Sequence, residues 1–503
     1  MSEEAIGLPG RAQQLPVARL QPDAIGVAQD TVIGMASSAP GASIGLTLAA
    51  LATATAYGSG PVLVLTAVPM LVIANAYRRL NMWNANCGAS FEWVGRAINP
   101  YLGFLTGWLM ITGYIIGAVA GVEVIGPSVL ALFGSSGSGG TWAEIGIATA
   151  VAVVMLVIAV LGIRLTARTQ VGMAAVEYAI LIGFGVAGLV AVLHHRPGTV
   201  PVTRAWFSLS GVGGHSSLAA GLLLAVFVYS GWEGTLYVNE EVKRRRINPG
   251  RAAIIAVALL TVIYALVVMG LQGVVPAAQL RAHSTTALIY IATALGGSGA
   301  AKVMALSLAL SVIAATGTNI VLTARIIYGM ASYRTLPGGL ASVSRRFATP
   351  VPASVVTGVV LIALAWVYFL AGSVQAAFDA VVSVSGLLFA AFYILTAMAT
   401  ITYYRRRVLA SPWDALVLGI LPLGAAGFLM WIIGRSIQEA PASQNWSLVA
   451  VVVLGLILML AARFGLRSAF FSIPRESDQP LRPGKSSSQN SVTPREPGGA
   501  SPP

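Results

Sequence analysis

Long apolar stretches recur along this chain, and they constrain its fold more than any other feature. Each is about 20 residues long, the length that an α-helix needs to cross a hydrocarbon core of roughly 30 Å. Hydrophobic residues make up 56% of the 503 residues and charged residues only 9%, whereas soluble domains carry roughly 25% charged residues. The apolar runs are continuous rather than alternating, which argues against a transmembrane β-barrel. We therefore expect an all-α membrane protein.

The hydropathy pattern predicts twelve membrane spans, and an even number of spans places both chain ends on one side of the membrane. The third and eighth spans are the longest, so we expect them to tilt or to extend beyond the bilayer. The predicted spans are 32–54, 60–78, 101–131, 143–162, 171–193, 217–239, 251–272, 301–330, 353–371, 378–402, 415–434 and 447–466.

The distribution of basic residues predicts the orientation. If the N-terminus is inside the cell, most of the 30 lysines and arginines, including Lys243–Arg246 and Arg405–Arg407, fall in cytoplasmic segments, as the positive-inside rule requires. The same rule accounts for the formal net charge of +13. Because no basic patch is interleaved with aromatic residues, a nucleic-acid partner is not expected. We expect a multi-pass protein of the cell membrane with both termini in the cytoplasm.

Two predicted spans carry helix-breaking residues at corresponding positions. The first contains SSAPGAS (37–43), where Pro40 removes a backbone donor and Gly41 loosens the helix. The sixth contains VFVYSGWEGTLYVNEE (226–241), with two glycines around Glu233. In each half, the second span is followed by a long connection (79–100 and 273–298) and then by a long third span. This pattern predicts a 5+5 inverted repeat with spans 1 and 6 broken, as in secondary transporters.

The repeat divides the chain into five segments. These are a cytoplasmic N-terminal segment 1–30, repeat one 31–195, repeat two 215–404, spans 11 and 12 in 413–468, and a Pro/Ser/Gly-rich tail 472–503 that we expect to be disordered in the cytoplasm.

A broken helix leaves unpaired N–H groups at the start of one half and unpaired C=O groups at the end of the other. The N–H end suits an anion and the C=O end suits a cation. Two such breaks side by side therefore form a receptor for a zwitterion, and an α-amino acid fits this description.

Several motifs resemble those of the amino acid–polyamine–organocation (APC) superfamily, and of amino acid permeases in particular. FVYSGWEGTLYVNEEVKRRRINPGRAAI (227–254) resembles the sixth-span signature of the superfamily. NANCGASFEWVGRAINPYLGFLTGWLM (84–110) resembles its loop between spans 2 and 3. AATGTNIVLTARIIYGMASYRTLP (314–337) and TPVPASVVTGVV (349–360) resemble the end of span 8 and the start of span 9. The matches cover spans 1–10 in order, and they imply a LeuT-type fold that works by alternating access.

The resemblance also implies a substrate site between spans 1, 3, 6, 8 and 10. In the family, the break of the first span binds the substrate carboxylate through backbone N–H groups, although this sequence has SSAPG where relatives usually have Gly-Ser-Gly. Carbonyl groups of the sixth span bind the ammonium group, and an aromatic residue closes over the substrate. The matching residues are Ser37, Ser38, Ala39 and Gly41 for the carboxylate, Tyr229, Ser230 and Gly231 for the ammonium, and Phe227 for the aromatic.

Three residues are candidates for coupling or gating. Trp232 and Glu233 follow the break of span 6, and Glu233 matches an acidic position of the family, with a helix-capping carboxylate as the alternative. Glu177 lies in span 5, where a charge is costly and usually functional. It is either a proton carrier or the partner of an arginine, Arg164 or Arg168, near the cytoplasmic interface.

Other polar residues suggest no further coupling site. Glu123, near the outer end of span 3, either contacts a cationic substrate or reaches the outer surface. No complete sodium site is recognisable, so H⁺ is the expected coupling ion. Cys87 is the only cysteine, and the four histidines lack metal-ligand spacing, so neither a metal nor another cofactor is expected.

These observations predict a secondary transporter of amino acids or closely related amines, driven by protons or working by exchange. A transporter of polyamines or other organic cations on the same fold is the alternative. An enzyme is not expected because no catalytic set of residues is present, and a twofold repeat argues against the ring-like filter of a channel. The expected partners are a small-molecule substrate and the lipid bilayer, with the oligomeric state left open.

Overall fold

The computed structural model describes residues 19–134, 140–210, 212–283, 286–370 and 374–477. Within these ranges the chain is helical throughout, apart from loops and an isolated β-bridge between Ile25 and Val242. Eleven helical stretches are long and apolar enough to cross a membrane. The first of them, Val27–Trp83, covers the first two predicted spans. The all-α membrane class is therefore confirmed, while the number of spans stays a prediction.

The long α-helices lie over the predicted spans, and shorter α-helices lie in the connections. In chain order they are α1 (Val27–Ser37), α2 (Pro40–Thr55), α3 (Ser59–Trp83), α4 (Ser90–Ala97), α5 (Pro100–Leu132), α6 (Gly140–Leu161), α7 (Ile163–Leu193), α8 (His215–Tyr229), α9 (Asn248–Leu271), α10 (Ala277–Ala282), α11 (Ala287–Ser332), α12 (Val351–Leu370), α13 (Val374–Tyr403), α14 (Arg405–Val408), α15 (Pro412–Ala415), α16 (Leu421–Glu439) and α17 (Ala442–Leu460).

The first predicted break separates α1 from α2. Ala39, between the two helices, adopts the left-handed conformation with φ +45°, which costs a residue with a β-carbon roughly 1–2 kcal/mol. Pro40 then occupies the first helical position, where its missing N–H group is not needed. The chain thus restarts a helix inside the bundle, as the SSAPG sequence predicts.

The second predicted break follows α8. Gly231 has φ +112°, and the chain continues as the 3-10 helix η3 (Trp232–Leu236) instead of the α-helical half that we expected. This segment is closely packed, because a β-carbon at Gly234 would lie 2.4 Å from the side chain of Leu322 in α11. The prediction of a break is confirmed, and the prediction of an α-helix after it is wrong.

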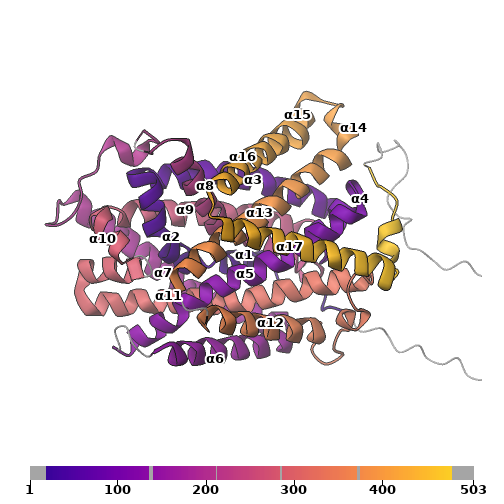
Figure 1. Ribbon diagram of the computed structural model, residues 1–503, viewed down its shortest axis with the longest axis horizontal. Helices are drawn as coiled ribbons and strands as arrows, with labels where there is room; N and C mark the ends of the chain where they lie inside the picture. Colours follow the sequence, from indigo (N-terminus) through magenta and orange to yellow (C-terminus); the bar gives the residue numbers. More distant parts are fainter. Residues whose placement is uncertain (1–18, 135–139, 211, 284–285, 371–373, 478–503) are drawn as a thin grey trace, which may run out of the picture.

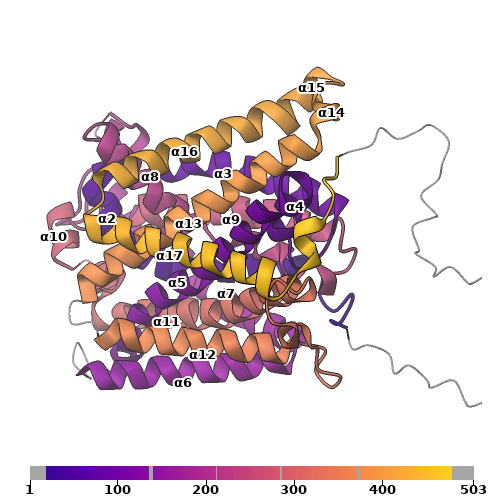
Figure 2. The ribbon, with the colours of Figure 1, turned by 45° about the vertical axis from the view of Figure 1, so that its right-hand side comes forward.

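The two longest helices, α5 and α11, pack against each other through the middle of the bundle (Figure 1). The kink of α11 at Gly296 and Gly297 separates its first turns from the span predicted at 301–330. Helices α6 and α12 form one edge of the bundle, α16 lies along the opposite edge, and α17 crosses between them (Figure 2). The middle of α5 and α11 is thereby shielded from both edges.

Both described chain ends lie at the same end of the bundle (Figures 1 and 2), which we call the terminal end. There, residues Ser468–Glu476 fold back onto α4, and we call this segment the clasp. The ring of Phe470 is fully buried and stacks on Phe91 with centroids 4.3 Å apart. A β-carbon at Gly95 would lie 2.5 Å from that ring, so glycine is required at position 95.

Polar contacts extend the clasp to α11. Arg96 of α4 pairs with Glu476 at 2.6 Å, and the hydroxyl of Ser468 donates to the carbonyl oxygen of Tyr333 at 2.6 Å. The segment 472–503, predicted as a disordered tail, therefore begins with residues that pack on the bundle. The rest of that prediction, from position 478 onward, lies outside the described residues.

The clasp leads to a prediction about stability. Phe470→Ala removes a buried ring, a change that typically costs about 3–5 kcal/mol. We expect the buried thiol of Cys87 to react with a thiol-specific fluorophore at a temperature several degrees lower than in the parent protein. The matched control is Phe464→Ala, because Phe464 is 70% exposed. Equal thermal profiles for both variants would show that the clasp adds no stability.

Candidate functional site

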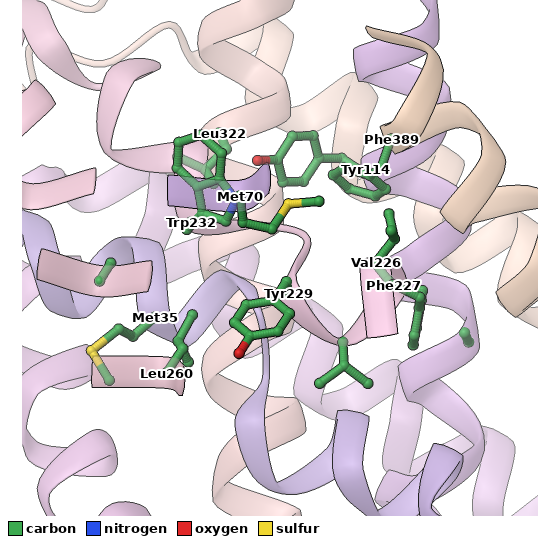
Figure 3. Close-up of a cluster of buried hydrophobic side chains, with 14 of the residues drawn as sticks. Met35, Met70, Tyr114, Val226, Phe227, Tyr229, Trp232, Leu260, Leu322 and Phe389 are labelled. Carbon is green, nitrogen blue, oxygen red and sulfur yellow. The ribbon is translucent and has the colours of Figure 1, made fainter. Parts of the chain in front are cut away.

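A cavity lies against both helix breaks. Its walls come from the α1–α2 break, the end of α8, and the middles of α5, α11 and α13. These are the five spans between which the resemblance places the substrate. Tyr114 and Phe389 line it from α5 and α13, with ring centroids 5.3 Å apart (Figure 3).

The two breaks touch each other directly. A β-carbon at Gly231 would lie 2.7 Å from both the carbonyl carbon of Ser37 and the nitrogen of Ser38. The hydroxyl of Ser37 donates to Oδ1 of Asn319 in α11 at 2.8 Å. Span 1, span 6 and α11 are therefore held together at one point, which forms part of the cavity wall.

Five of the eight residues predicted to bind substrate line the cavity: Ser37, Ser38, Ala39, Phe227 and Ser230. The other three, Gly41, Tyr229 and Gly231, do not. Tyr229 faces α9, where its hydroxyl contacts that of Thr261 at 3.1 Å, and Figure 3 shows its ring apart from the pair of Tyr114 and Phe389. Gly231 is used instead for the close approach of the two breaks.

The backbone donors at the start of α2 have partners inside the protein. The N–H group of Gly41 donates to Oε1 of Glu177 at 3.0 Å, and that of Ala42 donates to Oγ of Ser311 at 3.1 Å. The N–H groups of Ser38 and Ala39 donate to carbonyl oxygens of α1. In this structure, the donors that the resemblance assigns to a substrate carboxylate thus serve the fold.

Glu177 is fully buried in α7 and reaches the N-terminus of α2. Its Oε1 binds Gly41, while Oε2 has no hydrogen-bond partner. Neither Arg164 nor Arg168 pairs with it among the ion pairs of the described residues. Of the two sequence interpretations, the arginine pair near the interface is therefore wrong. The role as a proton carrier stays a prediction.

Glu233 is also fully buried, and it joins three elements. Its Oε1 accepts a hydrogen bond from the hydroxyl of Tyr114 at 2.7 Å. Its Oε2 accepts from the hydroxyl of Tyr393 at 2.6 Å and from the N–H of Gly231 at 3.1 Å. The last contact is the one expected of a capping carboxylate. Trp232 stacks on Tyr393 with centroids 5.6 Å apart, so both residues lie behind the cavity wall.

A buried ion pair lies near the terminal end of the bundle. Arg325 of α11 binds Glu241 through two hydrogen bonds, at 2.9 and 3.1 Å, with both side chains fully buried. The neighbouring Glu240 accepts a hydrogen bond from the N–H of Cys87 at 3.1 Å. The side chain of Glu123 lies outside the described residues.

Sequence reasoning missed three kinds of wall residue. Asn319 lies inside a motif that we quoted for the resemblance without assigning it a role. Gly113, Gly117 and Gly121 recur every four residues, a spacing that places them on one face of α5, and this signal was available in the sequence. Tyr114 and Phe389 gave no signal, because aromatic residues in spans usually pack the core. Among the described residues, no cluster of His, Cys, Asp or Glu could hold a metal ion.

The contact between the breaks can be tested by mutation. Gly231→Ala forces a methyl group into the backbone of Ser37 at a residue with φ +112°, so we expect loss of the folded monodisperse protein. Gly427→Ala is the matched control, because nothing lies within 4 Å of that β-carbon position. The measurement is size-exclusion chromatography of the detergent-solubilised proteins. Normal behaviour of Gly231→Ala would contradict the close approach.

Comparison with known proteins places the chain in a wider group. A sequence model for a family described as amino acid permease matches residues 29–456. An arginine/ornithine antiporter (ArcD2) of Lactococcus lactis subsp. cremoris is 21% identical over 440 residues, covering 79% of this chain and 87% of that protein. An uncharacterized transporter of Mycobacterium bovis is 28% identical over 346 residues, covering 68% of this chain and 73% of that protein.

Solved structures share the architecture. A manganese transporter of Eremococcus coleocola, in complex with an aromatic bis-isothiourea substituted compound, has a TM-score of 0.57 at 15% identity. The alignment covers 88% of this chain and 92% of that one. A mutant of the same transporter has a TM-score of 0.59. At this identity the likeness concerns the fold alone, and it confirms the expected LeuT-type architecture.

Proposed function

This chain belongs to the amino acid permease family of the APC superfamily, and we propose that it carries amino acids or closely related amines across the cell membrane. One observation carries the proposal: a cavity lined by both helix breaks and by three further spans. A transporter needs a site that both membrane faces can reach in turn, and a junction of broken helices near the middle of the bundle provides one. Because the family is one of transporters, an enzymatic role has no support.

The lining of the cavity is compatible with a zwitterion. Ser37, Ser38 and Ser230 bring hydroxyl groups from both breaks, while Phe227 and Phe389 bring apolar surface. A ligand site with a few polar groups among apolar ones is typical of small-molecule recognition. The named substrates of the Lactococcus relative are amino acids, which supports the same class here. No feature of the cavity favours the alternative of polyamines.

We propose further that protons drive this transport and that Glu177 carries the proton. An ionised carboxylate at the N-terminus of α2 is stabilised by the helix dipole and by the N–H of Gly41. Protonation weakens that hydrogen bond and so changes the contact that holds the start of α2, where Ala42 and Ser43 line the cavity. The protonation state of Glu177 is thereby linked to the wall of the cavity. Tyr178 and Tyr264 are the titratable side chains close to this carboxylate.

The orientation completes the proposal. Both ends of the described chain lie at the terminal end, and the basic loops support placing this end in the cytoplasm. The buried pair of Arg325 and Glu241 is then an inner gate, which opens when the site is released to the cell interior. Uptake from the outside accordingly requires that this pair separate in each cycle.

The proposed substrate class is tested with purified protein in proteoliposomes. Labelled amino acids and amines are offered with an inward proton gradient, with a sodium gradient, with unlabelled substrate inside the vesicles, and without any of these. We expect uptake of at least one amino acid with the proton gradient or with internal substrate. If no amino acid or amine enters above the level of protein-free vesicles under any condition, the proposed function is wrong.

The proton carrier is tested with Glu177→Gln. Glutamine keeps an oxygen that accepts the Gly41 N–H but cannot bind or release a proton, so uptake driven by the proton gradient should be lost while exchange is retained. Glu144→Gln is the control, because Glu144 lies partly exposed near the start of α6. Uptake rates are measured against external pH with both variants. A Glu177→Gln protein whose pH dependence equals that of the parent excludes Glu177 as the carrier.

A further inference from the structure

We propose that this cavity selects small neutral amino acids and that Asn319 is the residue that binds their carboxylate. The inference rests on the proposed function and narrows it to one substrate class. Three observations carry it: the hydrogen-bonding state of the polar groups that line the cavity, the charge of its described wall, and the glycine face of α5.

The hydroxyl groups at the cavity already donate their protons in hydrogen bonds within the protein. Ser38 donates to the carbonyl oxygen of Gly34, and Ser43 donates to that of Ser38. Ser230 donates to the carbonyl oxygen of Phe227, and Thr316 of α11 does the same to Val312. A hydroxyl whose proton is engaged still offers lone pairs. These oxygens therefore accept hydrogen bonds, which suits the ammonium group of a substrate and not its carboxylate.

Asn319 supplies hydrogen-bond donors instead of acceptors. Its Oδ1 accepts the proton of Ser37 at 2.8 Å, which orients the amide and leaves the two protons of Nδ2 for another partner. The residue lines the cavity and keeps 8% of its surface exposed. An amide N–H group is a donor and matches a carboxylate. Asn319 thus complements the hydroxyl oxygens, and the two together match a zwitterion.

The charge of the wall restricts the substrate side chain. No lysine, arginine, histidine, aspartate or glutamate is found among the described residues that line the cavity. Glu233 has its two oxygens occupied by Tyr114, Tyr393 and the N–H of Gly231. A second ammonium or a guanidinium would be buried there without a counter-charge, which is strongly unfavourable. Arginine and ornithine, named for the Lactococcus relative, are therefore poor substrates of this chain.

The glycine face of α5 determines the size of the substrate. Gly113, Gly117 and Gly121 line the cavity, and each added methyl group would occupy space that a substrate uses. A β-carbon at Gly121 would lie 3.4 Å from Val312, and one at Gly113 would lie 3.5 Å from Phe389. Both distances are ordinary contacts, so alanine fits the fold at these positions. Such a substitution reduces the cavity without disturbing its frame.

The charge selection is tested in proteoliposomes with alanine, leucine, arginine and glutamate at equal concentrations. We expect the initial uptake of alanine or leucine to exceed that of arginine and of glutamate at least tenfold. Glu123→Gln is included, because this glutamate lies outside the described side chains, and it should leave the preference unchanged. Uptake of arginine equal to that of the neutral amino acids, or a preference that changes in Glu123→Gln, would overturn the inference.

The role of Asn319 is tested with Asn319→Asp, which replaces a donor by a carboxylate of the same shape. We expect the KM for the best neutral amino acid to rise at least tenfold, with a much smaller change in maximal rate. An amine that lacks the carboxylate should compete better than it does in the parent protein. Gly427→Ala, at a β-carbon position with nothing within 4 Å, serves as the control. An unchanged KM in Asn319→Asp refutes the assignment.

The size selection is tested with Gly121→Ala. The KM for leucine should rise several-fold while that for alanine stays within twofold of the parent, and Gly427→Ala should change neither value. Equal effects on both substrates would contradict a role in selecting size. These outcomes differ from a failure of the proposed function, in which the parent protein takes up no amino acid or amine at all.

Discussion

A helix that stops inside a bilayer must find partners for its terminal backbone groups within the protein, because lipid offers none. Most features of this structure follow from that requirement. Each of the two helix breaks has its own buried carboxylate: Glu177 accepts the N–H of Gly41, and Glu233 accepts the N–H of Gly231. Each carboxylate stabilises one break only. The backbones of the two breaks nevertheless touch at Ser37 and Gly231.

The capping carboxylates of Glu177 and Glu233 approach the helix ends from the side away from the cavity, so the cavity stays free of them. Glu233 reaches Gly231 from the side of Tyr114 and Tyr393, and Glu177 reaches α2 from α7, so neither carboxylate faces a substrate. The described residues that remain on the wall are uncharged: hydroxyl groups, one amide, aromatic rings and a glycine face. The fold is shared with other members of the family, and the selectivity that we propose depends on these wall residues. A transporter of the same fold can therefore differ in substrate without any change in its architecture.

The sequence was sufficient for the class of fold, the positions of both breaks and the spans that form the cavity. Pro40 and Gly231 interrupt apolar runs, and such interruptions are visible without coordinates. The partners of the caps were not predictable, because Gly41 and Glu177 are 136 positions apart, and no local pattern links them. The close contact of Gly234 with Leu322 of α11 was not predictable for the same reason. The position of the Tyr229 ring was not predictable either, because the direction of a side chain at a helix end depends on tertiary packing.

The clasp has a consequence for how the protein is made. Arg96 and Glu476 are separated by 380 positions, so α4 is synthesised and inserted long before its partner leaves the ribosome. Throughout that interval the face of α4 that Phe470 covers stays bare, and Gly95 leaves a hollow there. The fold is sealed only by the last residues that the structure describes. The packing of α4 is thus complete only when the residues from Ser468 onward have been made. A chain that ends before Ser468 exposes an apolar hollow that cellular quality control can recognise.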